Sequence, residues 1–337
     1  MRTALVLVVA LAAVLFAAGA AFYYLVYVPP PRFTSARIIS IYRGESMATA
    51  ARKLSRGGVV RSAQAFAIYA EITAQASRLK PGDYAFRGGE TVPEVLRHLV
   101  DGDFMVVEVT IPEGITAHQI GARLEQAGLG CDSRFDAAAR EGAIPRALGL
   151  GALGAEGFLF PATYRFSPLA DTDQVLAAML ERFYSVLTPQ VEQRMFALGL
   201  DVRQVVTLAS IIEKEAKVPG ERPLIASVFY NRLALSMPLQ SDPTAQYNYA
   251  GEPERAAIAV HQVSAFNTYT IAGLPPGPIA NPGLDSIHAA LYPAHSDYLY
   301  FVARKDGTHI FSRSLQEHER AIDEVRRSNA RHSGPSG

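Results

Sequence analysis

The sequence has a single cysteine, Cys131, and no excess of charge, since 32 basic residues are balanced by 32 acidic ones. One cysteine excludes an intramolecular disulfide and a cluster of thiolate metal ligands. A net charge near zero argues against a nucleic-acid-binding protein, because neutralising phosphates requires an excess of basic surface. With 49% hydrophobic residues the chain is too apolar to be disordered, and its 337 residues can form about two domains.

Several common catalytic and metal-binding patterns are also absent from the sequence. It has no H-E-x-x-H pattern, no Walker P-loop and no G-x-S-x-G turn, and its eight histidines lack the spacing of metal ligands. Ser210 precedes Lys214 by one residue more than the S-x-x-K pattern of serine nucleophiles allows. We therefore expect neither a metal nor a cofactor, and no serine nucleophile of this type.

An uncharged, apolar segment runs from Thr3 to Val28 and carries three tyrosines near its end. Crossing a bilayer takes about 20 apolar residues, and aromatic rings favour the headgroup layer, so the segment predicts a transmembrane helix. Arg2 in front of it favours a cytoplasmic start. A cleaved signal peptide is the alternative, because Ala18-Gly19-Ala20 resembles a cleavage site, but the apolar run continues well beyond it. We expect a single-pass anchor in the cytoplasmic (inner) membrane, with the rest of the chain on the periplasmic, extracytoplasmic side.

Composition divides the chain into four parts. Residues 1–31 form the anchor and a short stiff linker, since the three prolines at 29–31 favour an extended chain. Residues 32–104 form a small α/β module, residues 105–330 a larger mixed α/β domain, and residues 331–337 a polar tail that we expect to be disordered. The predicted fold class is α+β, and a β-hairpin and a C-terminal helix close the larger domain.

The small module follows the order strand, helix, helix, strand. We predict strands at 38–42 and 84–86 and helices at 46–55 and 63–73, with a further helix that starts at a capping box of Thr91 and Glu94. The order resembles a LysM domain, which is a peptidoglycan-binding module, in shape and pattern. A structural spacer that binds nothing explains the pattern equally well.

The larger domain begins with a predicted strand at 104–110 and a helix at 117–126, followed by a poorly patterned helical stretch at 128–154. Two consecutive helices and a long loop rich in proline and glycine come later. A hairpin then joins strands at 298–303 and 308–312 through Asp306-Gly307, which is a strong turn signal. The last helix opens with Ser314 and Glu317 as a capping box.

The chemistry of the sequence points to one carboxylate near the end of a helix at 201–217. At about 100° per residue, Glu215 projects on the same face as three apolar residues, whereas Glu213 points roughly 160° away. The three apolar residues are Leu208, Ile211 and Ile212. A carboxyl against apolar surface has a raised pKa, as a general acid requires. The alternative is that Glu215 lies in water beyond the apolar stripe and makes only an ion pair at the helix end.

Polar residues farther along the chain offer further groups for a binding wall. Gln240 and Asp242 follow the next helix, and Asn267 precedes the loop rich in proline and glycine, whose backbone amides are available for binding. Tyr247 and Tyr269 are suited to stacking on sugar faces, although tyrosines at this density are as often core residues. Taken alone, the loop is better explained as a connector that covers the core.

Seven motifs in a fixed order carry a family resemblance. They are EGFLFPATY (156–164), LASIIEKE (208–215), SVFYNRL (227–233), LQSDPT (239–244), NTYT (267–270), GLPPGPI (273–279) and YLYFV (298–302). In this order they resemble the YceG-like endolytic murein transglycosylases, the MltG family, over nearly the whole chain, including the anchor and the LysM-like module. The departures are small: Ser241 stands where threonine is frequent and Pro278 where alanine is frequent, and neither alters a charge.

The resemblance implies a lyase that cuts peptidoglycan strands internally. The family cleaves the β-1,4 bond between N-acetylmuramic acid and N-acetylglucosamine and leaves a 1,6-anhydro-muramoyl end. Its catalytic glutamate is the second one of the E-K-E motif, which here is Glu215. One carboxylate is enough for this reaction, because the sugar's own 6-hydroxyl attacks carbon 1 and Glu215 can serve first as acid and then as base.

The resemblance also implies partners and accessory residues. The substrate is the peptidoglycan glycan strand, the anchor contacts the membrane, and peptidoglycan synthases, including penicillin-binding proteins, are implied partners. The family is thought to limit the length of nascent strands. The residues expected to bind substrate or to support its transition state are Glu213, Gln240, Asp242, Tyr247, Asn267 and Tyr269.

Two functions of other kinds stay open at this point. One is a non-catalytic scaffold that binds the cell wall through the LysM-like module, with Glu215 in a structural role. The other is a hydrolase in which Glu215 and Asp242 act as a pair, with Asp242 activating a water molecule. The products of glycan digestion separate a hydrolase from a transglycosylase.

Overall fold

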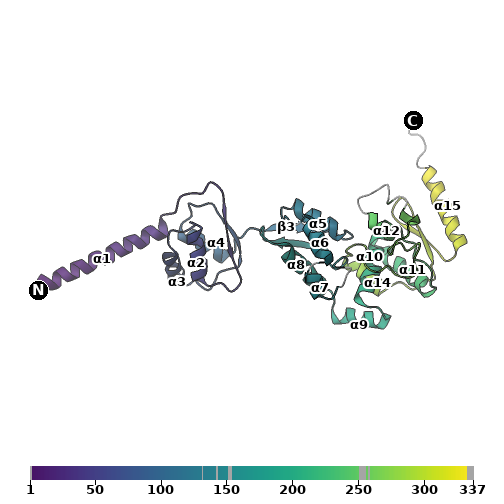
Figure 1. Ribbon diagram of the computed structural model, residues 1–337, viewed down its shortest axis with the longest axis horizontal. Helices are drawn as coiled ribbons and strands as arrows, with labels where there is room; N and C mark the ends of the chain where they lie inside the picture. Colours follow the sequence, from purple (N-terminus) through teal and green to yellow (C-terminus); the bar gives the residue numbers. More distant parts are fainter. Residues whose placement is uncertain are drawn as a thin grey trace, which may run out of the picture. The chain divides into compact units, whose positions relative to one another are not determined.

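The computed structural model describes residues 2–130, 132–141, 143–150, 154–249, 256 and 259–331. Cys131 and residues 332–337 of the expected tail lie outside the described residues. The chain forms two compact units, shown in Figure 1. The first comprises Met1–Val107 and Arg165–Leu169, and the second comprises Glu108–Tyr164 and Ala170–Gly337.

The first unit contains a long apolar helix, α1 (Arg2–Tyr27), and a small α/β module. The elements of the module are β1 (Arg37–Ile41), α2 (Met47–Arg56), α3 (Ala63–Ile72), β2 (Gly82–Phe86) and α4 (Val92–Asp101). β1 pairs antiparallel with β2, which confirms the predicted order of strand, helix, helix, strand. The capping box of Thr91 and Glu94 at the start of α4 is also confirmed. The likeness of the module to a LysM domain stays a prediction.

The apolar helix α1 packs directly against this module. Its segment Leu5–Tyr27 is long and apolar enough to span a membrane. Val26 in its last turn is only 1% exposed and belongs to the hydrophobic core of the module. Arg61 donates hydrogen bonds to the backbone carbonyls of Val28 and Pro29, where the chain leaves the helix. The prolines therefore do not hold the module away from α1, because the apolar end of α1 is itself part of the core.

From residue 107 onward the chain is mainly helical, with two small sheets. Its helices are α5 (Ala117–Gln126), α6 (Asp132–Glu141), α7 (Ala143–Ala147), α8 (Thr172–Tyr184), α9 (Pro189–Leu198), α10 (Val202–Glu215), α11 (Arg222–Ala234), α12 (Asp242–Gln246), α14 (Leu284–Leu291) and α15 (Leu315–Arg331). Short 3-10 turns occur at η2 (Pro219–Glu221), η3 (Tyr247–Tyr249) and η4 (Ala259–His261). β3 (Val107–Thr110) pairs with β4 (Thr163–Phe166), and β5 (Tyr300–Ala303) pairs with β6 (His309–Ser312).

Most of the predicted elements of this region are present. The hairpin is confirmed, with Phe301 opposite Phe311 in an antiparallel register. The prediction passed over α8 and α9, although Asp171 and Thr188 cap their N-termini through side-chain hydrogen bonds. These caps are local signals, so both helices could have been predicted from the sequence.

α10 is the central helix of the second unit and positions the predicted catalytic glutamate. The predicted capping box of Asp201 and Gln204 starts it, and all eight residues from 205 to 212 are buried. α11, α12 and α14 contact it, as Figure 1 shows. The helix ends at Glu215 because Ala216 adopts an extended conformation. Burial on all sides explains why the apolar pattern of this helix is nearly continuous.

Candidate active site

Glu215, the last residue of α10, has a sheltered carboxyl group. Ser241, just before α12, donates its Oγ hydrogen to Glu215 Oε1 at 2.5 Å. Burial raises the pKa of Glu215 to about 7, the nearby charge of Asp242 adds to the rise, and the hydrogen bond from Ser241 opposes it. The direction agrees with the expectation from the helix face. Glu215 is therefore not a solvated residue at a helix end.

Asp242 and Tyr269 form the outer part of the same cluster. Asp242 opens α12 immediately after Ser241, and Tyr269 Oη donates a hydrogen bond to Asp242 Oδ1 at 2.6 Å. Asp242 is exposed and Tyr269 is 37% exposed, so the cluster reaches the surface. Burial, together with the hydrogen bond to Asp242, raises the pKa of Tyr269, which therefore stays a proton donor at neutral pH. The structure thus brings Asp242 and Tyr269 together near Glu215, as the motifs suggested.

Buried hydroxyl groups lock the LQSDPT and NTYT motifs to each other. Ser241 N donates to Thr268 Oγ1 at 3.0 Å, and the Oγ1 atoms of Thr244 and Thr268 lie 2.8 Å apart. All three side chains are almost fully buried. Because these residues are 24 to 27 positions apart, the contacts fix Ser241 with respect to the turn that carries Tyr269.

Gln240 and Asn267 shape the backbone of this cluster. Gln240 is exposed and has a left-handed backbone (φ 52°), and its Oε1 accepts a hydrogen bond from Arg232 at 3.1 Å. Asn267 is completely buried, and its Nδ2 donates to the backbone carbonyls of residues 259, 260 and 262. Its Oδ1 accepts a hydrogen bond from the backbone N–H of Tyr269 at 3.0 Å. Asn267 is therefore buried beneath the surface, contrary to the expectation that it lines a binding wall, because its amide is bonded to the backbone of the residues on either side of it.

Glu213 faces away from this cluster, as the helical periodicity predicts, and it is buried by an ion pair. Its side chain is 8% exposed, and Arg222 Nη2 lies 3.5 Å from its Oε1. Its Oε2 accepts hydrogen bonds from Ser286 Oγ at 2.7 Å and from Gly283 N at 3.2 Å. Glu213 thus joins α10 to α11 and to the start of α14, and the structure does not bring it to Glu215.

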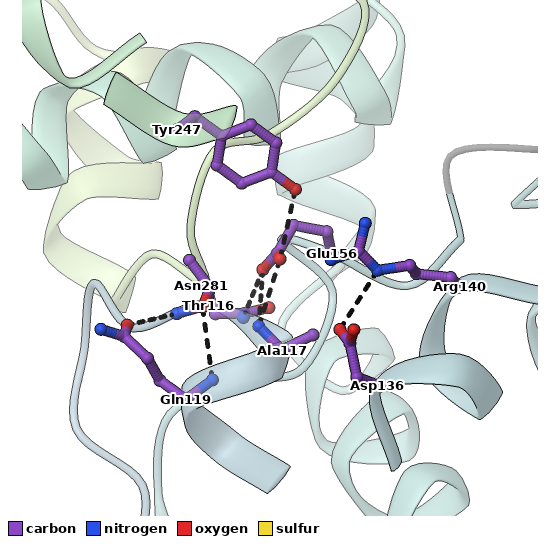
Figure 2. A network of polar contacts seen from close by, with 8 residues as sticks. All are labelled: Thr116, Ala117, Gln119, Asp136, Arg140, Glu156, Tyr247 and Asn281. Carbon is purple, nitrogen blue, oxygen red and sulfur yellow. Dashed lines mark hydrogen bonds and ion pairs between the residues drawn. The ribbon is translucent and has the colours of Figure 1, made fainter. Parts of the chain in front are cut away.

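Tyr247 belongs to a second cluster, which is centred on Glu156 and shown in Figure 2. Tyr247 Oη donates to Glu156 Oε2 at 3.4 Å, and Asn281 Nδ2 donates to Glu156 Oε1 at 2.9 Å. Burial raises the pKa of Glu156 to about 7, against the hydrogen bond from Ala117 N and the charge of Arg140. Sequence reasoning did not single out Glu156, although an acidic residue inside the apolar motif EGFLFP was a usable signal.

The Glu215 cluster combines groups that are suited to acid–base chemistry. It holds one carboxyl that changes its charge near neutral pH, a neighbouring carboxylate, and hydroxyl donors from Ser241 and Tyr269. Among the described residues, no group of three Asp, Glu, His or Cys side chains is arranged to hold a metal ion. Two carboxyl groups in different environments are typical of sites that move protons to and from a substrate.

Comparisons with known proteins show the family to which the chain belongs. The profile of the YceG-like family matches residues 39–324. An endolytic murein transglycosylase of Bacillus subtilis (strain 168) is 33% identical over 302 residues, which cover 84% of this chain and 83% of the relative. A protein of the same name from Streptococcus pneumoniae serotype 2 is 30% identical, and the match covers 85% of this chain but only 58% of the longer relative. A crystal structure of a YceG-like protein from Listeria monocytogenes is 30% identical, with a TM-score of 0.59 over 85% of this chain and 98% of that one.

Proposed function

The chain belongs to the YceG-like family, and we propose that it is an endolytic lytic transglycosylase of peptidoglycan with Glu215 as its catalytic residue. The observation that carries the proposal is the sheltered Glu215 carboxyl, with a pKa of about 7 and a hydrogen bond from Ser241. The names of the relatives, which match most of this chain, support the same class of reaction. The resemblance of the seven motifs to the family supports Glu215, the second glutamate of the E-K-E motif, as the catalytic residue.

In the first step, Glu215 acts as the acid. A pKa of about 7 keeps roughly half of the molecules protonated at neutral pH. Because Ser241 donates to Oε1, we assign the acidic proton to Oε2. Glu215 gives this proton to the oxygen of the β-1,4 bond between N-acetylmuramic acid and N-acetylglucosamine. The bond from carbon 1 to that oxygen breaks, and the N-acetylglucosamine side leaves with the proton.

In the second step, the Glu215 carboxylate acts as the base. The 6-hydroxyl of the same muramic acid attacks carbon 1 and passes its proton to Glu215, which restores the acid for the next cycle. The new bond closes a 1,6-anhydro ring, and no water is consumed. The attack is intramolecular, so a second carboxylate to position a nucleophile is not needed.

Asp242 and Tyr269 support the transition state in this proposal. Positive charge develops at carbon 1 as the bond breaks, and a fixed carboxylate beside Glu215 stabilises it. The hydroxyl of Tyr269 holds the Asp242 carboxylate in one orientation. Gln240 stays a proposed contact for the glycan, whereas the Tyr247 hydroxyl is bonded to Glu156 instead. Glu213 and Asn267 do not face the substrate in this proposal and act by fixing α10 and the neighbouring loop.

The same proposal assigns a place in the cell wall. α1 holds the enzyme in the cytoplasmic membrane, with the module and the catalytic domain on the extracytoplasmic side, where new strands are made. Cleavage there limits the length of nascent strands, the LysM-like module binds the strand, and peptidoglycan synthases are the partners that this location favours.

Mass spectrometry of digested glycan tests the proposal. Purified, uncrosslinked strands are incubated with the full-length enzyme in detergent, and the masses of the new ends are measured. Anhydro ends, which are lighter by one water than reducing ends, are expected from the wild type and not from Glu215→Gln. Reducing ends would instead favour a hydrolase that uses Asp242 to activate water. If the wild type gives no cleavage and Glu215→Gln still functions in cells, the scaffold interpretation holds.

A further inference from the structure

Glu156 is a second buried acid in the same unit, and the proposed reaction does not use it. It lies in the turn between α7 and β4 and is 8% exposed. Figure 2 shows three donors around its carboxylate. Ala117 N lies 3.1 Å from each oxygen, Asn281 Nδ2 lies 2.9 Å from Oε1, and Tyr247 Oη lies 3.4 Å from Oε2. A buried carboxylate needs such donors to replace water, so these contacts are a condition of its burial.

The three donors come from segments that are far apart in the sequence. Ala117, Tyr247 and Asn281 are 39, 91 and 125 residues from Glu156. Ala117 opens α5, Tyr247 lies in η3 directly after α12, and Asn281 lies in the loop before α14. The Glu156 carboxylate therefore connects the start of α5, the η3 turn and the loop before α14.

Two of these segments are connected to Glu215 or to its helix by hydrogen bonds. η3 continues α12, and the residue before α12, Ser241, donates the hydrogen bond to Glu215. The loop that contains Asn281 is bonded to α10 at two points. Ile279 N donates to Ser210 Oγ at 3.1 Å, and Gly283 N donates to Glu213 Oε2 at 3.2 Å. Both the helix that carries Glu215 and the segment that holds its partner are thus tied to Glu156.

We propose that Glu156 is a positioning residue for Glu215, which acts by clamping the η3 segment through Tyr247 and the 279–283 loop through Asn281. The inference rests on the proposed function, because it assigns Glu156 a part in the reaction of Glu215. Glu156 touches neither Glu215 nor the bond to be cut in this scheme. A displacement of about 1 Å of a catalytic group can lower a rate about 100-fold, so the clamp matters without contacting the substrate.

The clamp is expected to depend on pH. The charged and titratable groups around Glu156 are Arg140 and Asp136 of α6, joined by a hydrogen bond of 3.2 Å, Glu141 at the end of α6, which lines the same cavity, and Tyr247 of η3. Burial raises the pKa of Glu156 to about 7. Protonation converts one accepting oxygen into a donor, so a hydrogen bond to the carboxylate is lost as the pH falls. The reaction then requires ionised Glu156 and protonated Glu215, which predicts a rate maximum near neutral pH.

Glu156→Gln in the full-length enzyme tests the proposal. Rates on soluble, uncrosslinked glycan strands are measured against pH, with Glu141→Gln, in the wall of the same 240 Å³ cavity, as the matched control. We expect Glu156→Gln to lower kcat about 10- to 100-fold with little change in KM, and to lose the acid limb of the profile while keeping the alkaline limb. Glu141→Gln should match the wild type. A wild-type profile of Glu156→Gln overturns the proposal, and so does a change confined to KM, which indicates direct substrate binding.

Tyr247→Phe provides an independent test, because it leaves the Glu156 side chain in place. It removes a hydrogen bond that lowers the pKa of Glu156, so the acid limb should move to higher pH. If Glu156 acts through Tyr247, adding Tyr247→Phe to Glu156→Gln should cost no further activity. Losses that multiply in the double variant, or an acid limb that stays in place in Tyr247→Phe, overturn the proposal.

The role of Glu156 and the transglycosylase reaction can be rejected separately. Anhydro ends from the wild type, together with an unaffected Glu156→Gln variant, reject only the role of Glu156. Reducing ends from the wild type reject the transglycosylase reaction, whatever the pH profile of Glu156→Gln.

Discussion

Replacing Glu215 by glutamine removes the proton that the proposed reaction needs and keeps the shape of the side chain. The amide oxygen can still accept the hydrogen bond from Ser241, so the local structure should persist. One positioned acid or base typically contributes 10²- to 10⁴-fold to a rate. Because Glu215 is proposed to serve in both steps, we expect the loss to be about 1000-fold or more.

The same substitution should stabilise the folded protein at alkaline pH. The pKa of Glu215 rises from 4.5 to about 7 on folding, because burial disfavours the charged form. The folded state therefore holds this proton more tightly than the unfolded state. Its contribution to stability is complete below pH 4.5 and is lost as the pH rises through about 7. At about 1.4 kcal/mol for each tenfold change in proton affinity, the loss is at most about 3.5 kcal/mol.

The amide of Glu215→Gln does not ionise, so the variant does not lose stability as the pH rises through about 7. The wild type and the variant should unfold at similar temperatures at pH 4, whereas at pH 8 the variant should be more stable by about 1–3 kcal/mol, or roughly 2–8 °C in Tm. Thermal unfolding of the full-length protein in detergent measures this difference. Glu125→Gln, at an exposed glutamate on α5, is the matched control and should show no gain.

Two results would refute the reasoning about Glu215. A Tm difference that is the same at pH 4 and pH 8 would mean that burial does not raise its pKa. Wild-type cleavage rates in Glu215→Gln would mean that another group carries the proton. Activity lost without the stability gain would separate the two claims, since the catalytic role would stand and the raised pKa would not.

Three further substitutions test the surroundings of Glu215. Ser241→Ala removes a hydrogen bond that lowers the pKa of Glu215, so the alkaline limb of the pH–rate profile should move to higher pH; a limb that does not move contradicts the assignment. Tyr269→Phe releases the Asp242 carboxylate and should lower kcat about 3- to 30-fold, measured by steady-state kinetics; an unchanged kcat would remove Asp242 orientation from the mechanism. Glu213→Gln weakens the buried ion pair between α10 and α11 and should lower the free energy of unfolding by about 1–3 kcal/mol, measured by urea denaturation; equal stability would show that the pair contributes nothing.

The elements that local signals control were predictable. The capping boxes at Thr91 and Asp201 and the turn at Asp306-Gly307 act within a few residues, and the structure contains the helices and the hairpin that they predict. The face of the helix on which Glu215 lies was also predictable, because its place relative to the apolar residues follows from the helical repeat alone.

The partners of the site residues were not predictable in the same way. Asn267 has the polarity of a binding residue, yet it is buried because three backbone carbonyls surround its amide. Glu213 points away from the apolar stripe, yet its side chain is buried because Arg222, Ser286 and Gly283, from other segments, contact its carboxylate. The anchor prediction located the apolar helix but could not show that Val26 at its end packs into the module.

Short-range patterns in the chain thus decided where helices and turns form and which glutamate sits against apolar surface, because backbone geometry and capping depend on neighbouring residues. Contacts between distant segments decided which polar groups surround each buried acid. The donors to Glu156 come from as far as 125 residues away, and Glu215 meets Ser241 across 26 residues. Burial of a carboxyl group, and with it the pKa that its chemistry requires, is a property of such assembled surroundings, so only the folded chain could decide it.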